Sequence, residues 1–142
     1  MCFRTKLNAR IVKIEKAFEA NFTEPELYIP QKEINGFDFL PNPVITDVSP
    51  EEILFYNWGL IPFWSKNDHL KKSTLNARIE SLDEKPAYRN SVNNRCLVIA
   101  NGFYEWQWMD EKGKKKQKYL ITSAREEIFA FAGIYSHSDD PV

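Results

Sequence analysis

The chain has 142 residues, of which 43% are hydrophobic, 14% aromatic and 27% charged, and its formal net charge is −1. This composition can build one core, and it excludes an intrinsically disordered chain. The balanced charge argues against binding polyanions through the net field, so any contact with nucleic acid must use a local patch. No apolar run approaches the roughly 20 residues of a membrane-spanning helix, and no signal-peptide pattern opens the chain. We expect a single cytoplasmic domain over residues 1–142.

Helical periodicity is clearest near the start of the chain. Apolar residues recur at helical spacing over residues 9–20, which predicts an amphipathic helix with Asn8 as its N-cap. Residues 21–42 carry three prolines and one glycine, a composition typical of irregular structure. We predict a loop there, with short strand pieces around residues 27–29 and 37–39.

The middle of the chain mixes helical and extended signals. Residues 49–52 (SPEE) resemble a capping box with proline at the first helical position, which predicts one helical turn before a strand. Residues 60–65 (LIPFWS) contain a proline and two large aromatic side chains, and we expect a loop packed against the core. Residues 66–74 are polar and expected to be exposed, and residues 86–92 are expected to form one short helix.

The last third of the chain is dominated by closely spaced β-type runs. Residues 110–116 (DEKGKKK) predict a hairpin turn with Gly113 at its tip. One helix, several long loops and these strands indicate a β-rich α+β domain with a barrel-like, curled antiparallel sheet and a few short helices. The four predicted strands cover residues 95–100, 103–109, 118–122 and 128–134.

The two cysteines are too few for a disulfide framework and lie in different surroundings. Cys96 lies in an apolar run and is expected to be a small buried hydrophobe. Cys2 follows Met1, and removal of the initiator methionine would leave an α-amine and a thiol on one residue. An α-amine with a pKa near 7.7–8.0 can condense with an aldehyde, and the thiol can then close a five-membered thiazolidine. Taken alone, a cysteine after the initiator methionine is more often an ordinary residue than a nucleophile.

Two further groups of residues suggest chemistry. If residues 76–80 (NARIE) are extended, Asn76, Arg78 and Glu80 share one face and could hold a phosphate and orient a nucleophile. The alternative is an exposed strand with a local ion pair. Glu105 lies in an aromatic stretch, where a carboxylate must be paired or have a raised pKa, as a general acid or base requires. The alternative is a strand on which the Glu105 side chain faces solvent.

Several remaining residues receive a plainer interpretation. The four tryptophans are expected to be mostly core, although an exposed one beside Arg78 or Arg89 would offer a stacking platform for unpaired bases. The lysines of residues 112–118 are expected to form a solvated hairpin tip, within possible reach of a DNA backbone. His69 and His137 lack the partner pattern of a metal site, so we predict no metal and no cofactor.

Several motifs occur together, in one order, over almost the whole chain, and they resemble the SOS-response-associated peptidase (SRAP) family. The motifs are Met1-Cys2 with Arg4, and residues 58–64 (WGLIPFW), 76–80 (NARIE), 85–89 (KPAYR), 95–100 (RCLVIA), 101–106 (NGFYEW) and 131–134 (FAGI).

The resemblance implies a function and a set of site residues. SRAP members shield abasic sites in single-stranded DNA by crosslinking covalently to the sugar aldehyde through the N-terminal cysteine, as a thiazolidine. By this resemblance Cys2 is the nucleophile, Asn76 positions its amine and the sugar, and Glu105 is the acid and base. The DNA contacts implied are Arg4, Arg78 and Arg89 to phosphates, with Trp64 or Trp106 lining the DNA channel. The family fold is a β-rich domain on a barrel-like sheet.

The sequence also departs from the family pattern. Phe3 stands where the family has glycine, residues 35–41 replace the usual Arg-Tyr-Asn-x-x-Pro segment, and the family's catalytic histidine, expected after residues 131–134, is not found before Val142. The sequence thus indicates a divergent SRAP-like domain that lacks the family's C-terminal segment. We expect slower crosslinking without that histidine.

Two alternatives remain open. One is a truncated or degenerate SRAP relative that binds single-stranded DNA without a covalent bond. The other is an N-terminal-cysteine peptidase or amidohydrolase, as the family name suggests. We also expect association with the nucleoid when DNA is bound, and a homodimer through an exposed sheet edge.

Overall fold

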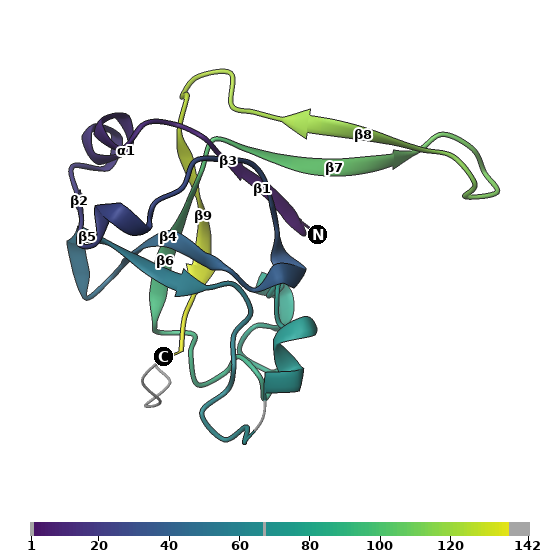
Figure 1. Ribbon diagram of the computed structural model, residues 1–142. Helices are drawn as coiled ribbons and strands as arrows, with labels where there is room; N and C mark the ends of the chain where they lie inside the picture. The colour runs from purple at the N-terminus through teal and green to yellow at the C-terminus, as the bar shows by residue number, and fades with distance from the viewer. Residues whose placement is uncertain (1, 67, 137–142) are drawn as a thin grey trace.

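The computed structural model describes residues 2–66 and 68–136, which form two antiparallel-rich sheets, one α-helix and short 3₁₀ turns (Figure 1). The first sheet has four strands in the order β3-β1-β7-β8. Its strands are β1 (Arg4–Leu7), β3 (Gln31–Asn35), β7 (Gly102–Trp108) and β8 (Lys116–Ile121). The second sheet has five strands in the order β2-β5-β4-β6-β9. Its strands are β2 (Asn21–Phe22), β4 (Pro41–Thr46), β5 (Ser49–Asn57), β6 (Arg95–Ala100) and β9 (Phe129–Ile134).

The α+β class is confirmed, whereas the barrel-like, curled sheet was wrong. Each sheet is open: β3 and β8 form the edges of the first, and β2 and β9 the edges of the second. A closed barrel needs its first and last strands to pair, and among the described strands β3 does not pair with β8, nor β2 with β9. The second sheet is also not purely antiparallel, because β2 runs parallel to β5. None of the described helices is long and apolar enough to cross a membrane.

The core lies between the two sheets and helix α1 (Ile11–Phe18). Leu7 and Ile34 enter it from the first sheet, Ile53 and Ile99 from the second, and Ile14 from the helix, and each is buried. Removing these side chains from water is the main force that joins the sheets. Because Leu7 is the last residue of β1, the same packing fixes the strand that leads back to Cys2.

The amphipathic helix is confirmed, although it is shorter than expected and its N-cap prediction was wrong. Arg10 is the N-cap, and its side chain makes no capping hydrogen bond. Asn8 bonds instead with Asn101: its Oδ1 accepts from Asn101 Nδ2 at 2.9 Å, and its backbone N–H donates to Asn101 Oδ1 at 3.3 Å. The side chain that a cap would use therefore ties the end of β1 to the loop before β7.

The strand pieces predicted around residues 27–29 and 37–39 are absent. In their places the structure has the 3₁₀ turns η1 (Pro25–Leu27) and η2 (Gly36–Asp38). The predicted helical turn at residues 49–52 was also wrong, because β5 begins at Ser49, which pairs with Thr46 of β4. Cross-strand pairing outweighs the local capping signal. Residues 86–92 likewise form consecutive turns, and no helix is assigned there.

The middle loops follow the predictions in part. Residues 60–65 are a loop, as predicted, and Pro62 is buried, but Phe63 is 75% exposed and Trp64 is 49% exposed. Most of the described residues between 66 and 74 are exposed, and this segment includes the 3₁₀ turn η3 (Asp68–Lys72). Thr74 is the exception, because its buried hydroxyl donates to the carbonyl of Leu60 at 2.6 Å.

The four late strands are confirmed with small changes at their ends, and the hairpin turn is where it was predicted. Strands β7 and β8 pair antiparallel from Phe103 and Ile121 out to Trp108 and Lys116. Gly113 has a φ of 64°, a left-handed conformation that suits glycine at the turn. Beyond the body of the protein the two strands form a free ribbon (Figure 1). Cys96 is buried in β6, as predicted.

Candidate active site at the start of the first strand

Cys2 lies immediately before β1, a strand held between β3 and β7. Its half-buried thiol donates a hydrogen bond to the carbonyl of Arg4 at 3.3 Å. Burial raises the pKa of the Cys2 thiol; backbone hydrogen bonding at Arg4 lowers it by less than burial raises it, and the Glu105 carboxylate adds a smaller increase. The thiol is therefore mostly protonated at neutral pH, and it is a weak nucleophile in that form.

Asn76 reaches Cys2 from a loop on the opposite side of the site. Its Nδ2 donates to the backbone carbonyl of Cys2 at 2.8 Å, across 74 positions of sequence. The loop has no regular structure but is fixed by side chains from elsewhere. Trp58 Nε1 donates to the carbonyl of Leu75 at 2.8 Å, and the hydroxyl of the buried Tyr88 donates to the carbonyl of Asn76 at 3.0 Å. These bonds hold the Asn76 amide in place.

Glu105 lies on β7, the strand that pairs with β1 through Thr5 and Phe103. Its side chain is half-buried, and its charge acts on the Cys2 thiol. The site thus holds an amide and a carboxylate around Cys2, drawn from a loop and a strand. This arrangement can position a backbone group at residue 2 and move protons beside it.

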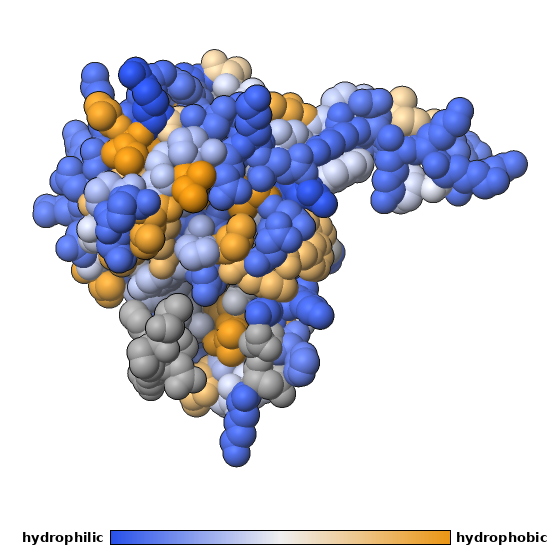
Figure 2. All heavy atoms as spheres, viewed as in Figure 1, coloured by the Kyte–Doolittle hydropathy of each residue, from blue (hydrophilic) through white to orange (hydrophobic). Residues whose placement is uncertain are grey.

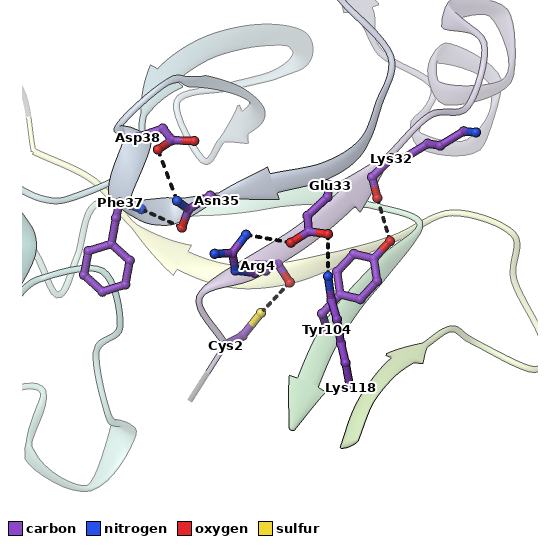
Figure 3. Close-up of polar contacts among 9 residues, drawn as sticks. All are labelled: Cys2, Arg4, Lys32, Glu33, Asn35, Phe37, Asp38, Tyr104 and Lys118. Carbon is purple, nitrogen blue, oxygen red and sulfur yellow. Dashed lines mark hydrogen bonds and ion pairs between the residues drawn. The ribbon is translucent and has the colours of Figure 1, made fainter. Parts of the chain in front are cut away.

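At the start of β1, two cations share one carboxylate: Arg4 and Lys118 both contact Glu33 (Figure 3). Arg4 Nη1 is 2.6 Å from Glu33 Oε1, and Lys118 Nζ is 2.5 Å from Glu33 Oε2. The hydrogen bond from Lys118 lowers the pKa of the Glu33 carboxyl, with Arg4 adding to the effect. The Arg4 guanidinium also lies 5.9 Å from the centre of the Trp106 ring. One carboxylate between two cations leaves the group with a net positive charge.

Two of the departures from the family pattern meet at this site. The Phe3 ring stacks on Phe37, with centroids 5.3 Å apart. Phe37 belongs to η2, in the segment that replaces the usual Arg-Tyr-Asn-x-x-Pro, and Gly36 of the same turn donates its N–H to the carbonyl of Phe3 at 2.9 Å. The bulky residue after Cys2 is therefore packed against the replacement segment.

The family model of the SOS response associated peptidase (SRAP) matches residues 1–141. This chain belongs to the SRAP family. Curated relatives include the abasic site processing protein YoqW of Bacillus subtilis, 38% identical over 69% of this chain and 43% of YoqW. YoaM of the same organism is 40% identical over 65% of this chain and 40% of YoaM. HMCES of Gallus gallus is 38% identical over 53% of this chain and 23% of HMCES. The SRAP chain thus spans less than half the length of these relatives.

Solved structures agree with the fold. A protein from Bacteroides thetaiotaomicron has a TM-score of 0.83 and 33% identity, over 94% of the SRAP chain and 59% of its own chain. A protein from Bordetella bronchiseptica has a TM-score of 0.74 and 22% identity, over 94% and 63%, a likeness that concerns the fold alone.

The structure brings some of the predicted site residues of the SRAP chain together. Cys2, Asn76 and Glu105 converge, and Arg4 and Trp106 lie beside each other at the same place. The other three predicted DNA contacts are exposed and lie on loops and turns outside the two sheets: Trp64, Arg78 and Arg89.

Two expectations about local structure near these residues were wrong. Residues 76–80 do not form a strand: Arg78 is the N-cap of the 3₁₀ turn η4 (Ile79–Ser81), which carries Glu80. The tryptophans are not mostly core, because Trp58 is half-buried whereas the other three are exposed. Among the described residues, no group of three or more His, Cys, Asp or Glu side chains is placed to hold a metal ion. His137 lies outside the described residues.

Sequence reasoning missed Glu33. It lies on β3, in a segment expected to be loop, and no short-range pattern connects it with Arg4 or Lys118. Its position is set by the pairing of β1 with β3, in which Arg4 lies opposite Asn35 and Thr5 opposite Ile34. Only a correct prediction of a strand at residues 31–35 could have indicated that Glu33 lies near these cations.

Proposed function

We propose that this SRAP protein processes abasic sites in single-stranded DNA by forming a covalent thiazolidine through Cys2. The proposal requires hydrolysis of the Met1–Cys2 peptide bond, which frees the α-amine. The observation that carries it is the hydrogen bond from Asn76 Nδ2 to the Cys2 carbonyl, beside the charge of Glu105. The names of YoqW, YoaM and HMCES, each an abasic site processing protein, support the choice of substrate.

The reaction begins at nitrogen. An unperturbed α-amine has a pKa near 7.7–8.0, so about a tenth of such groups is uncharged at pH 7, whereas burial raises the pKa of the Cys2 thiol. The amine attacks the aldehyde carbon of the ring-opened sugar and forms a carbinolamine. Loss of water from the carbinolamine then gives the imine. Glu105 takes the proton that the amine gives up and delivers it to the departing hydroxyl.

The thiol completes the product. Its sulfur adds to the imine carbon, the C=N bond becomes a single bond, and the thiol proton passes to nitrogen. Aldehyde and aminothiol therefore give thiazolidine and one water. Because sulfur and nitrogen belong to one residue, ring closure is intramolecular and benefits from a high effective concentration. Asn76 fixes the Cys2 backbone through this sequence, while Arg4, Arg78 and Arg89 contact phosphates and Trp64 or Trp106 lines the strand's path.

A denaturing gel with a single strand carrying one abasic site tests the proposal. The protein, with removal of Met1 verified by intact mass, is expected to give a retarded covalent band. Cys2→Ala should abolish the band, and Cys96→Ala should keep it, because Cys96 is the buried cysteine of β6. An undiminished band for Cys2→Ala, or no band from the protein lacking Met1, would contradict the proposal.

The same gel separates the alternatives. Salt-dependent retention on native gels alone, equal for abasic and intact DNA, would favour non-covalent binding. Hydrolysis of a peptide or glutamine substrate, lost in Cys2→Ala, would favour an amidohydrolase. The raised pKa of the Cys2 thiol argues against the latter, since such enzymes need the thiolate.

A further inference from the structure

The free part of the β7–β8 hairpin is built unlike the rest of the molecule. We call residues 106–118 the arm; it leaves the body near the start of β1 (Figure 1) and carries a mostly hydrophilic surface (Figure 2). Every residue of β8 is exposed. A two-stranded ribbon with both faces in water gains little from burial. The sequence of the arm is therefore not explained by packing against the body.

Charge sets the arm apart. The arm contains five lysines, all within residues 112–118, against two acidic residues, Asp110 and Glu111, in a chain whose formal net charge is −1. Asp110 shapes the turn: its Oδ1 accepts from the backbone N–H of Lys114 at 2.8 Å and of Lys115 at 3.2 Å. The tip is thus a local positive patch on a nearly neutral protein, which is the usual electrostatic mark of a surface that binds a polyanion.

The arm is ordered by its own side chains. Lys116 Nζ lies 3.9 Å from the centre of the Trp108 ring, and a side chain at Gly113 would meet that ring at 3.5 Å. Trp108 therefore packs against the turn on which the lysines lie. Lys118 Nζ lies 4.3 Å from the centre of the Tyr104 ring and pairs with Glu33 at the candidate site. Cations follow one another from Arg4 through Lys118 and Lys116 to the tip.

We propose that the arm binds the phosphate backbone of a single-stranded nucleic acid next to the candidate active site. The choice of DNA rests on the proposed function, whereas the preference for a polyanion rests on the arm alone. From Tyr104 to Trp108 the strand advances about 14 Å, the axial length of about four phosphates in one strand of B-form DNA. The arm would therefore contact DNA outside the nucleotides at Cys2.

A second copy of this chain is a less suitable partner for the arm than a nucleic acid. β8 is an edge strand, and such strands are targets for pairing with another sheet. Lysines along an edge oppose that pairing, and two such arms brought together would repel each other. The same lysines that disfavour a dimer complement phosphate.

Binding of intact single-stranded DNA, measured as a function of salt, tests the arm. The test variant is Lys114→Gln/Lys116→Gln, and the control is Lys13→Gln/Lys16→Gln on α1, with the same loss of charge. We expect the test variant to bind about fivefold to tenfold more weakly at about 50 mM salt, with a salt slope smaller by about 1.4. Lys114→Arg/Lys116→Arg should bind as the unmodified protein does.

Strand length gives a second readout. The loss in the Lys→Gln test variant should disappear when the intact single strand is shortened to about four nucleotides, a length that cannot extend from the candidate site to the arm. Equal losses in the test and control variants, or a loss independent of strand length, would overturn the proposal. Concentration-dependent dimers that Lys114→Gln/Lys116→Gln strengthens would also overturn it, since they would assign the arm to self-association.

The test is separable from that of the proposed function. Covalent capture by Cys2 is scored on denaturing gels with the unmodified arm, and salt-dependent affinity is scored on intact DNA, which has no aldehyde. A protein that binds through the arm but forms no covalent band would support the arm and refute the thiazolidine. Covalent capture by Cys2, together with DNA binding that the arm variants leave unchanged, would support the thiazolidine and refute the role of the arm.

Discussion

At the scale of single residues, the site depends on one amide. The Asn76 side chain bonds directly to Cys2, through the 2.8 Å contact between its Nδ2 and the Cys2 carbonyl. Its own carbonyl is held by Tyr88, so the amide is positioned before any substrate arrives. A preorganised group of this kind acts on rate more than on binding.

Asn76→Ala should slow covalent capture of an abasic strand while leaving non-covalent affinity nearly unchanged. The variant removes one hydrogen bond worth about 1 kcal/mol, so we expect the rate to fall about fivefold to tenfold. Asn94→Ala is the matched control, because Asn94 Nδ2 also donates to a backbone carbonyl, that of Tyr135 at 3.3 Å, away from Cys2. Single-turnover kinetics on gels measure the rate. Equal slowing in both variants would mean that Asn76 acts only through stability.

The group of residues around Cys2 could be predicted only in part from the individual residues. Cys2 and Glu105 carried a chemical signal of their own, a terminal aminothiol and a carboxylate among aromatics. Asn76 was expected on a strand, and it lies in a loop that Trp58 and Tyr88 hold from outside. Its role followed only from the family resemblance, because the contacts that place it span many positions of the chain.

At the scale of elements, local patterns succeeded where strands follow each other directly. β6 matches its predicted bounds, and β7, β8 and β9 differ by one or two residues at most of their ends, since hairpin neighbours need only a turn signal such as Gly113. The same reasoning failed for β3 and for the first residues of β5, although the rest of β5 was predicted as a strand. β3 is defined by its pairing with β1, and the start of β5 by its pairing with β4, so neither has a signal within its own sequence.

The element that joins arm and site is β3, through Glu33. This carboxylate pairs with both Arg4 and Lys118, and each partner is about one-third exposed. Exposed pairs of this kind contribute little to stability. Their greater effect is on the charge offered to DNA, because a phosphate must compete with Glu33 for both cations.

Glu33→Gln should therefore strengthen binding of intact single-stranded DNA. Two cations become available, so we expect about threefold to tenfold tighter binding at low salt and a salt slope steeper by about 1.4. Fluorescence anisotropy across a salt series measures both quantities. Glu127→Gln is the control, since Glu127 pairs with Lys13 of α1 and loses the same charge there. Weaker binding by Glu33→Gln would show instead that the carboxylate is needed to hold the Arg4 and Lys118 side chains in place.

At the scale of the whole molecule, one core supports both sheets and hence the site. Leu7 lies on the strand that leads to Cys2, and it packs with Ile53 and Ile99 of the other sheet and with Ile14 of the helix. The sequence predicted the apolar face of that helix correctly. The sequence did not predict two open sheets, because the order of strands depends on pairings between distant segments, such as β1 with β7 and β4 with β6.

Ile14→Ala should test this dependence, because Ile14 is fully buried whereas Val12 on the same helix is 73% exposed. Loss of a buried isoleucine side chain costs about 2–5 kcal/mol, through lost burial and the cavity left behind. Val12→Ala should change the free energy of unfolding by no more than about 0.5 kcal/mol. Urea unfolding measures both. Since the core fixes β1, Ile14→Ala should also lower covalent capture at temperatures where part of the protein is unfolded, and cooling should restore it. Capture that stays low in the fully folded variant would mean that the helix acts on the site by another route.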